Sequence, residues 1–154
     1  MGDISVFNII MRFFHIFAVV MAVGGSIFTA FVVLPATHVL PPEARENFYE
    51  IARKRSATLV ALSIGLLLIT GFYNYLMVQM PMHKGQAVYH ALMGVKILLA
   101  FLVFFIASAV TGKSPAFEKI RSARRKWIRL QILASLAIIA IGAVLRAIPP
   151  MGHH

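Results

Sequence analysis

The sequence predicts an all-α protein, an integral membrane four-helix bundle with both termini on the non-cytoplasmic side. The chain of 154 residues is 60% hydrophobic and only 13% charged, whereas a soluble domain carries about 25% charged residues. Four apolar runs each reach the ~20 residues that a helix needs to cross a bilayer. The basic residues gather in two of the three connecting loops, and this bias sets the orientation.

The apolar runs form a single transmembrane domain over residues 1–154. The first run exceeds one bilayer thickness, so its early part is expected at the interface, and it is interpreted as a retained span and not a signal peptide. Pro35 is expected to end it, because a proline disfavours helix just before it. The stretch EARENFYEIARKR predicts a short amphipathic helix on the membrane surface, separate from the second span. The spans are expected at about residues 4–34, 56–77, 88–110 and 127–148.

The first and third loops carry most of the positive charge. The other side of the membrane has only Arg12, Lys84 and Arg146. The positive-inside rule therefore places the basic loops in the cytoplasm and predicts a multi-pass protein of the inner (plasma) membrane. Basic loops facing anionic lipid explain the net charge of +10 better than nucleic acid does, since no soluble basic domain is present. The loop cations are Arg45, Arg53, Lys54, Arg55, Lys113, Lys119, Arg121, Arg124, Arg125, Lys126 and Arg129.

Composition and motifs exclude several classes of chemistry. The chain has no cysteine, which removes disulfides, thiolate nucleophiles and iron–sulfur clusters. All five acids lie in termini or loops, so no carboxylate pair is expected inside the bilayer. There is no P-loop, no G-x-S-x-G and no H-E-x-x-H. Hydrolysis is therefore not supported.

His15 is the polar residue that stands out in the first apolar run. Helical spacing places small or weakly polar residues on its side of the helix, and large apolar residues cover much of the rest. Membrane helices turn small residues toward neighbouring helices, so His15 is expected to point into the bundle. The small face comprises Asn8, Val19, Ala22, Ser26 and Thr29, and the large residues are Phe13, Phe14, Phe17, Val20 and Phe28.

Polar residues of all four spans are expected near one level of the membrane. At ~1.5 Å per residue, His15, Asn74, His90 and Arg146 lie about 26–30 Å from the cytoplasmic ends of their helices, and Lys96 lies about 21 Å from its end. Ionisable residues inside a membrane suggest function. Each also has a simpler interpretation: snorkelling for the two cations, an interfacial position for His90 and a hydrogen bond between helices for His15.

A haem group would satisfy this layer. Neutral imidazole is an axial ligand of haem iron, and the ring needs small residues beside it. His15 and His90 are candidate ligands, and Lys96 or Arg146 could offset the propionate charges. His90 and Lys96 point about 120° apart on their helix, so one rotation of that helix cannot aim both equally well at the bundle axis.

Two alternatives stay open. Copper is the first, because thioether and imidazole ligands on the outer side suit it. The second is a structural subunit of a membrane complex, with no cofactor of its own. The candidate copper ligands are Met77, Met80, Met82 and His83, with Met151, His153 and His154 at the C-terminus of the chain.

Four segments of the chain resemble a known superfamily. FFHIFAVVMAVGG in the first helix, ENFYEIARKR, LMGVKILLAF and RRKWIRLQ are similar to segments of the superfamily that holds the HemJ-type protoporphyrinogen oxidases and the CopD copper-resistance domain. The resemblance implies a four-helix membrane protein that binds haem b, with His15 as an axial ligand and Lys96 as its functional, catalytic partner.

The activity implied by the resemblance is haem-linked redox chemistry. The protein would be a porphyrinogen oxidase-like oxidoreductase or an electron-transfer subunit, with a quinone or a porphyrin-type molecule as its small-molecule partner. A homo-oligomer or a larger membrane complex is the expected assembly.

Overall fold

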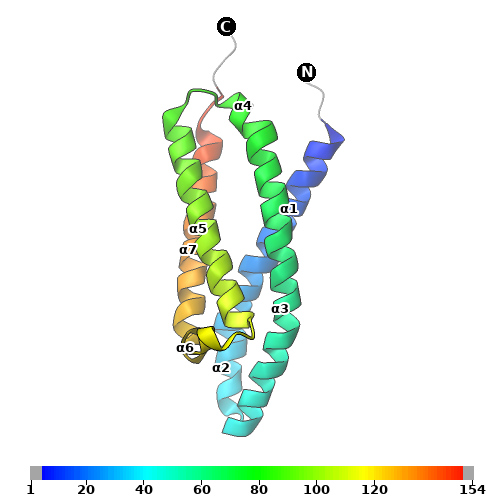
Figure 1. The fold of residues 1–154 in the computed structure, drawn as a ribbon, viewed down its shortest axis with the longest axis vertical. Helices are drawn as coiled ribbons and strands as arrows, with labels where there is room; N and C mark the ends of the chain where they lie inside the picture. The colour runs from blue at the N-terminus through cyan, green and yellow to red at the C-terminus, as the bar shows by residue number, and fades with distance from the viewer. Residues whose placement is uncertain (1–4, 151–154) are drawn as a thin grey trace.

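The structure, a computed structural model, describes residues 5–150 and is helical through most of that range (Figure 1). The described residues contain no strand. Four helices are long and apolar enough to cross a membrane. The predicted all-α class and the prediction of four helices long enough to cross a membrane are therefore confirmed, while the predicted first residue of the first span, Ile4, lies outside the described range.

The first span continues past the proline that was expected to end it. Pro35 lacks an amide hydrogen and its ring would clash with the carbonyl four residues earlier in a regular helix. The preceding segment is a π-helix, in which the Leu34 amide bonds to the Thr29 carbonyl, and this wider turn accommodates the ring. The prediction of an end at Pro35 was wrong for this reason. The elements of this span are α1 (Val6–Phe28), η1 (Thr29–Val33), α2 (Leu34–Ala36) and η2 (Thr37–Val39).

The second span and the expected surface helix form one continuous helix, α3 (Pro42–Tyr73). No proline or glycine occurs near Arg55, so nothing interrupts the backbone hydrogen bonds there, and the prediction of two separate segments was wrong. Pro42 is suited to the first helical position, where no amide partner is needed. A second π-helix, η3 (Asn74–Gln79), precedes Pro81 in α4 (Met80–Met82), as η1 precedes Pro35.

The third and fourth spans agree closely with the sequence prediction. A turn in which Gly85 adopts φ 85°, a conformation that suits glycine, leads into α5. Gly112 ends α5 and a short basic connection leads to α7. The elements are α5 (Ala87–Thr111), η4 (Pro115–Phe117), α6 (Glu118–Ser122) and α7 (Arg124–Ala147).

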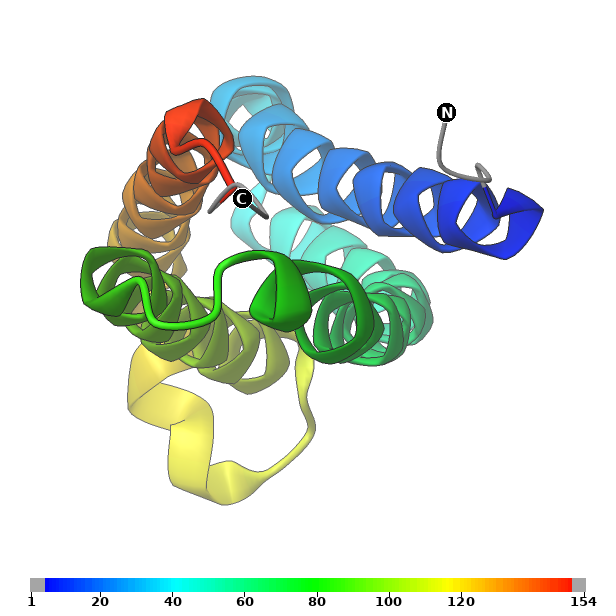
Figure 2. The ribbon, with the colours of Figure 1, turned by 90° about the horizontal axis from the view of Figure 1, so that it is seen from above.

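The four long helices are arranged as two pairs. Helix α1 packs mainly on α3, and α5 packs mainly on α7, with fewer contacts between the pairs. Figure 2 shows the two pairs side by side from above. Between the pairs, Gln131 of α7 donates a hydrogen bond of 2.7 Å to the Ser26 hydroxyl of α1. Both polar groups are therefore satisfied within an apolar bundle.

The outward face of α1 is the aromatic one, as the sequence predicts. Phe13 is 61% exposed and Phe17 is 48% exposed, whereas Ala18 is buried. His15 and the small residues of its face are partly buried. The bundle thus presents large apolar side chains where lipid would lie.

Candidate functional site

A cavity of about 960 Å³ lies between the two helix pairs and is lined by all four spans. Its size is typical of ligand pockets, which measure about 300–1,000 Å³. Four of the residues predicted for the haem site line it: His15, Asn74, Lys96 and Arg146. His90 is not among the lining residues.

Thr70 fixes the orientation and the proton of the His15 ring. His15 Nδ1 lies 2.9 Å from Thr70 Oγ1, and the single hydroxyl proton of Thr70 is donated to the Leu66 carbonyl. The hydroxyl therefore accepts from His15, whose proton is on Nδ1. In the neutral ring this leaves the Nε2 lone pair available as a ligand.

Gly71 leaves room beside the same ring. A Cβ atom at Gly71 would lie 3.4 Å from His15 Cε1 and 3.8 Å from Nδ1, so a larger side chain would press on the imidazole. The backbone of α3 approaches α1 closely here because this position has no side chain. Thr70 and Gly71 therefore hold the ring from adjacent positions of one helix.

Lys96 points from α5 toward α7, where its Nζ lies 3.8 Å from the place of a Cβ on Gly142. Lys96 and His15 line the same cavity from different helices. Arg146 and Arg12 line the same cavity. No carboxylate occurs among the described lining residues, so the cavity has three cations and suits a ligand that brings negative charge.

Asn74 lines the cavity from the first residue of the π-helix η3. Beside it, Tyr73 donates a 2.7 Å hydrogen bond to Asn8 Oδ1, which ties α3 to α1 two turns before His15. Single π-turns in helices are frequent at functional sites. The α1–α3 pair is therefore joined by polar contacts at the His15 ring and two turns before it.

His90 is engaged elsewhere. Its Nε2 lies 3.1 Å from the His83 carbonyl and must donate to it, so its Nδ1 accepts from the Tyr75 hydroxyl at 3.1 Å. With both nitrogens bonded, His90 has no free lone pair for a metal. The structure does not bring His90 together with His15, because the rotation of α5 that turns Lys96 inward directs His90 toward η3.

The four residues of the predicted copper cluster are divided between two surroundings. Met82 and His83 line the cavity, whereas Met77 is 68% and Met80 48% exposed and neither lines it. His83 is buried and stacks on Tyr89 at 3.7 Å between ring centroids. The other predicted copper residues, Met151, His153 and His154, lie outside the described residues. Within residues 5–150 no three His, Cys, Asp or Glu side chains gather as a metal site.

Several site residues were not predicted from the sequence. Arg12 had a signal, since it precedes His15 by three residues and so shares its helical face. Thr70 and Gly71 had a weaker one, a polar and a small residue together in the apolar run LLLITGFYNY. A hydroxyl in such a run is expected to seek a partner, but the sequence does not say on which helix.

The fold and the cavity define a four-helix membrane bundle with a histidine and three cations around a central pocket. No family model matches the chain, and no solved structure matches it. A protein of Aquifex aeolicus (strain VF5), described as an uncharacterized protein, is 26% identical over 135 residues, which are 87% of this chain and 92% of that protein. The chain is therefore similar to a protein of nearly the same extent.

Proposed function

We propose that the chain is a membrane haem b protein in which His15 is the axial ligand. The observation that carries this proposal is the hydrogen bond from His15 Nδ1 to Thr70, because it leaves Nε2 as the basic nitrogen of a ring that lines the cavity. A single imidazole suits a metal that arrives with its remaining ligands, as iron does in haem.

The charges of the cavity support the same ligand. Haem b carries two propionates, and Arg12, Lys96 and Arg146 are three cations in a cavity without a described carboxylate. Lys96 is half-buried, whereas Arg12 and Arg146 are exposed, and a cation is stabilised by an anionic partner most where it is shielded from water. Asn74 adds a polar group that could bind at the same rim.

One protein ligand is proposed in place of two. Because His90 uses both ring nitrogens in hydrogen bonds, His15 is the only imidazole assigned to the iron. Bound haem would supply one-electron redox chemistry, with one face left for a small molecule. This favours haem-linked redox chemistry on a quinone or porphyrin-type substrate, consistent with the HemJ-type resemblance.

Lys96 has a defined part in this proposal. Its ammonium lies 3.8 Å from the place of a Cβ on Gly142, in the cavity that His15 also lines. There it holds an anionic group of the haem or of the substrate by charge. The catalytic role implied by the resemblance is this electrostatic positioning.

Copper handling has less support, since Met77 and Met80 lie outside the cavity that Met82 and His83 line. In a cofactor-free structural subunit, the three cations of the cavity would have no anionic ligand to bind. Neither alternative has a specific observation in its favour.

An absorption spectrum tests the proposal. The purified full chain, produced with haem supplied, is measured oxidised and dithionite-reduced beside His15→Ala and His90→Ala. The expected result is a Soret band with sharp reduced α and β bands that is lost in His15→Ala and kept in His90→Ala. A colourless wild-type protein overturns the proposal, and loss in His90→Ala instead of His15→Ala overturns the ligand assignment.

The orientation is proposed from the charge bias, with the basic loops in the cytoplasm and the protein in the inner membrane. The chain has no cysteine, so a single introduced cysteine is the only thiol of the protein that can react with a labelling reagent. Lys84→Cys is expected to react with a membrane-impermeant maleimide in intact cells, and Lys119→Cys only after lysis. The reverse pattern would contradict this orientation.

A further inference from the structure

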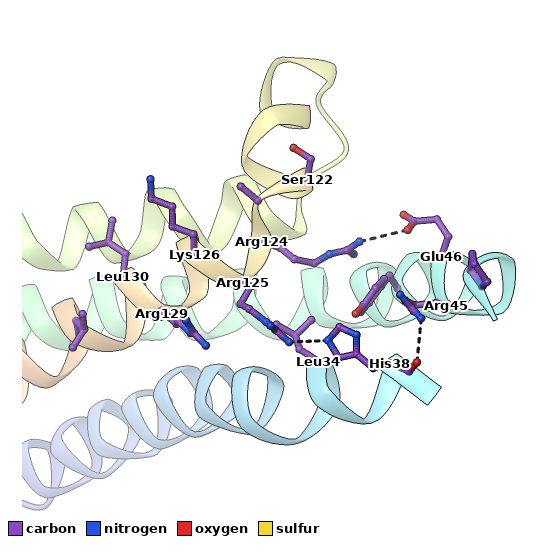
Figure 3. A pocket seen from close by; sticks show the side chains of 14 residues that line it. Leu34, His38, Arg45, Glu46, Ser122, Arg124, Arg125, Lys126, Arg129 and Leu130 are labelled. Carbon is purple, nitrogen blue, oxygen red and sulfur yellow. Dashed lines mark hydrogen bonds and ion pairs between the residues drawn. The ribbon is translucent and has the colours of Figure 1, made fainter. Parts of the chain in front are cut away.

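A second pocket, of about 870 Å³, lies at the opposite end of the bundle from His90 and Arg146, between α2, α3 and the start of α7 (Figure 3). Five cations line it and the one acid among the described lining residues is Glu46. Apolar residues of α2 and α7 continue the lining toward the centre of the bundle. The cations are Arg45, Arg124, Arg125, Lys126 and Arg129, and the apolar residues include Leu34, Leu130 and Leu133.

Two of these cations are held by the protein itself. Arg45 donates to three backbone carbonyls, those of residues 37, 38 and 40, and so closes the turn before α3. Arg124 lies 3.6 Å over the ring of Tyr49 and 3.4 Å from Glu46. These contacts leave Arg45 and Arg124 as parts of the wall, and they neutralise the single acid.

The charges of Arg125 and Arg129 are not neutralised by any acid among the described residues. Arg125 donates to His38 Nε2 at 2.8 Å, which is a neutral acceptor, and Arg129 has no hydrogen bond or ion pair with any residue in the described range. Figure 3 shows both side chains extending from α7 toward α2, while Lys126 extends to the other side. Arg125 and Arg129 are four residues apart in α7 and so share one face of the helix, from which both can contact one ligand.

The N-terminus of α7 also favours the binding of an anion in this pocket. A helix N-terminus carries a partial positive charge, and the first turn of α7 contains no acid to offset it. Arg125 therefore adds positive charge where the backbone is already positive. A negatively charged ligand bound at this end of the pocket would therefore be stabilised by both the helix N-terminus and Arg125.

Below the cations the lining becomes apolar. Leu133 lies two turns after Arg125 on the same side of α7 and is 65% exposed, and Leu130 is 40% exposed. This order along the helix, cations first and exposed leucines deeper, matches the order of headgroup and acyl chain in a phospholipid.

We propose that this pocket binds an anionic phospholipid, with the phosphodiester on Arg125 and Arg129 and an acyl chain along Leu130 and Leu133. Basic pockets between transmembrane helices are suited to such headgroups, and guanidinium groups bind phosphate in a bidentate manner. The site is separate from the haem cavity and does not depend on the proposed function.

The quenching of Trp127 tests this proposal. Trp127 is the single tryptophan of the chain. It lies in the first turn of α7, beside the pocket but not among its lining residues, so its fluorescence reports on lipid chains at this end of the bundle. The full chain is reconstituted in vesicles of phosphatidylcholine and phosphatidylglycerol in which either lipid carries brominated acyl chains. Brominated phosphatidylglycerol is expected to quench at about 25-fold lower mole fraction, since each of the two arginines contributes about fivefold to anion binding near a membrane.

Matched variants distinguish a specific lipid-binding site from non-specific attraction by the positive charge of the protein. Arg125→Gln/Arg129→Gln is expected to bring the two lipids within twofold of each other, while Lys113→Gln/Lys119→Gln, with the same loss of charge, keeps the preference. Arg125→Lys/Arg129→Lys is expected to keep part of it. Circular dichroism of each variant checks that the helical content is unchanged.

Three results would overturn the proposal. Equal quenching by both lipids in the wild-type protein would remove the site without reference to any variant. Equal loss in the Lys113/Lys119 control would assign the preference to diffuse charge. Loss of the preference in excess inorganic phosphate, at constant ionic strength, would assign the pocket to free phosphate in place of a lipid.

Discussion

Thr70→Val tests the central contact of the haem proposal with little change in shape. Valine replaces the hydroxyl of a residue that is 2% exposed by a methyl group. The ring of His15 loses the acceptor for its Nδ1 proton, which lies 2.9 Å away. The Leu66 carbonyl loses the side-chain bond but keeps the backbone bond that a helix gives it.

The expected size of the effect follows from one hydrogen bond. Such a bond contributes about 1 kcal/mol net, and a partner that orients a metal-bound histidine is worth about 10–100-fold in affinity. Thr70→Val is therefore expected to weaken haem binding about tenfold. Thr70→Ser keeps a hydroxyl at the same position and is expected to remain within about twofold of the wild type.

Titration of haem into the haem-free protein in detergent, followed at the Soret band, measures this difference. Circular dichroism and thermal unfolding of both variants report whether the bundle is intact. The reasoning is refuted if Thr70→Val binds haem as tightly as the wild type, or if Thr70→Ser loses as much as Thr70→Val.

Three further predictions concern the same cavity. His15→Ala is expected to insert in the membrane with unchanged helical content by circular dichroism while losing haem absorption, because the ring makes one hydrogen bond to the fold; failure to insert would indicate a structural role. Gly71→Leu is expected to weaken haem binding at least tenfold in the same titration, since a Cβ there already reaches 3.4 Å from His15, whereas Gly65→Leu, with nothing within 4 Å, should bind normally. Lys96→Gln/Arg146→Gln should weaken haem binding about 30-fold if each cation contributes about 1 kcal/mol to a contact with a propionate. Haem dimethyl ester, which lacks the two charges, should bind the variant and the wild type alike, and an equal loss for the ester would contradict the assignment.

Much of the architecture could be predicted from the sequence. Four apolar runs and their breaks at Gly112 and Pro149 locate the spans, because a bilayer demands helices of a set length. The face of α1 with His15 could also be predicted, since the 3.6-residue period places small residues together and phenylalanines apart. Sequence patterns were sufficient to predict the features that depend on a single helix, namely its length, its buried face and, at Gly112 and Pro149, its end.

The helix ends required the structure. A proline such as Pro35 predicts an end by its missing amide hydrogen and its ring, but the π-turn of η1 makes room for the ring by widening the preceding turn, and the helix continues without that one hydrogen bond. The second error, a predicted break near Arg55, arose from a change from polar to apolar composition. Such a change does not interrupt backbone hydrogen bonds, so α3 continues through Arg55. Composition predicts the environment of a segment, and backbone geometry decides where the helix ends.

The sequence by itself determined a four-span, basic-looped membrane bundle with His15 on its inner face, because burial in lipid constrains length, period and charge. Only the tertiary structure decided which polar groups meet. The rotation of α5 turned Lys96 inward and left His90 bonded to Tyr75 and His83. The docking of α3 on α1 brought Thr70 to His15 across 55 residues of chain. Such pairings depend on the relative rotation of whole helices, which packing sets and no local pattern records.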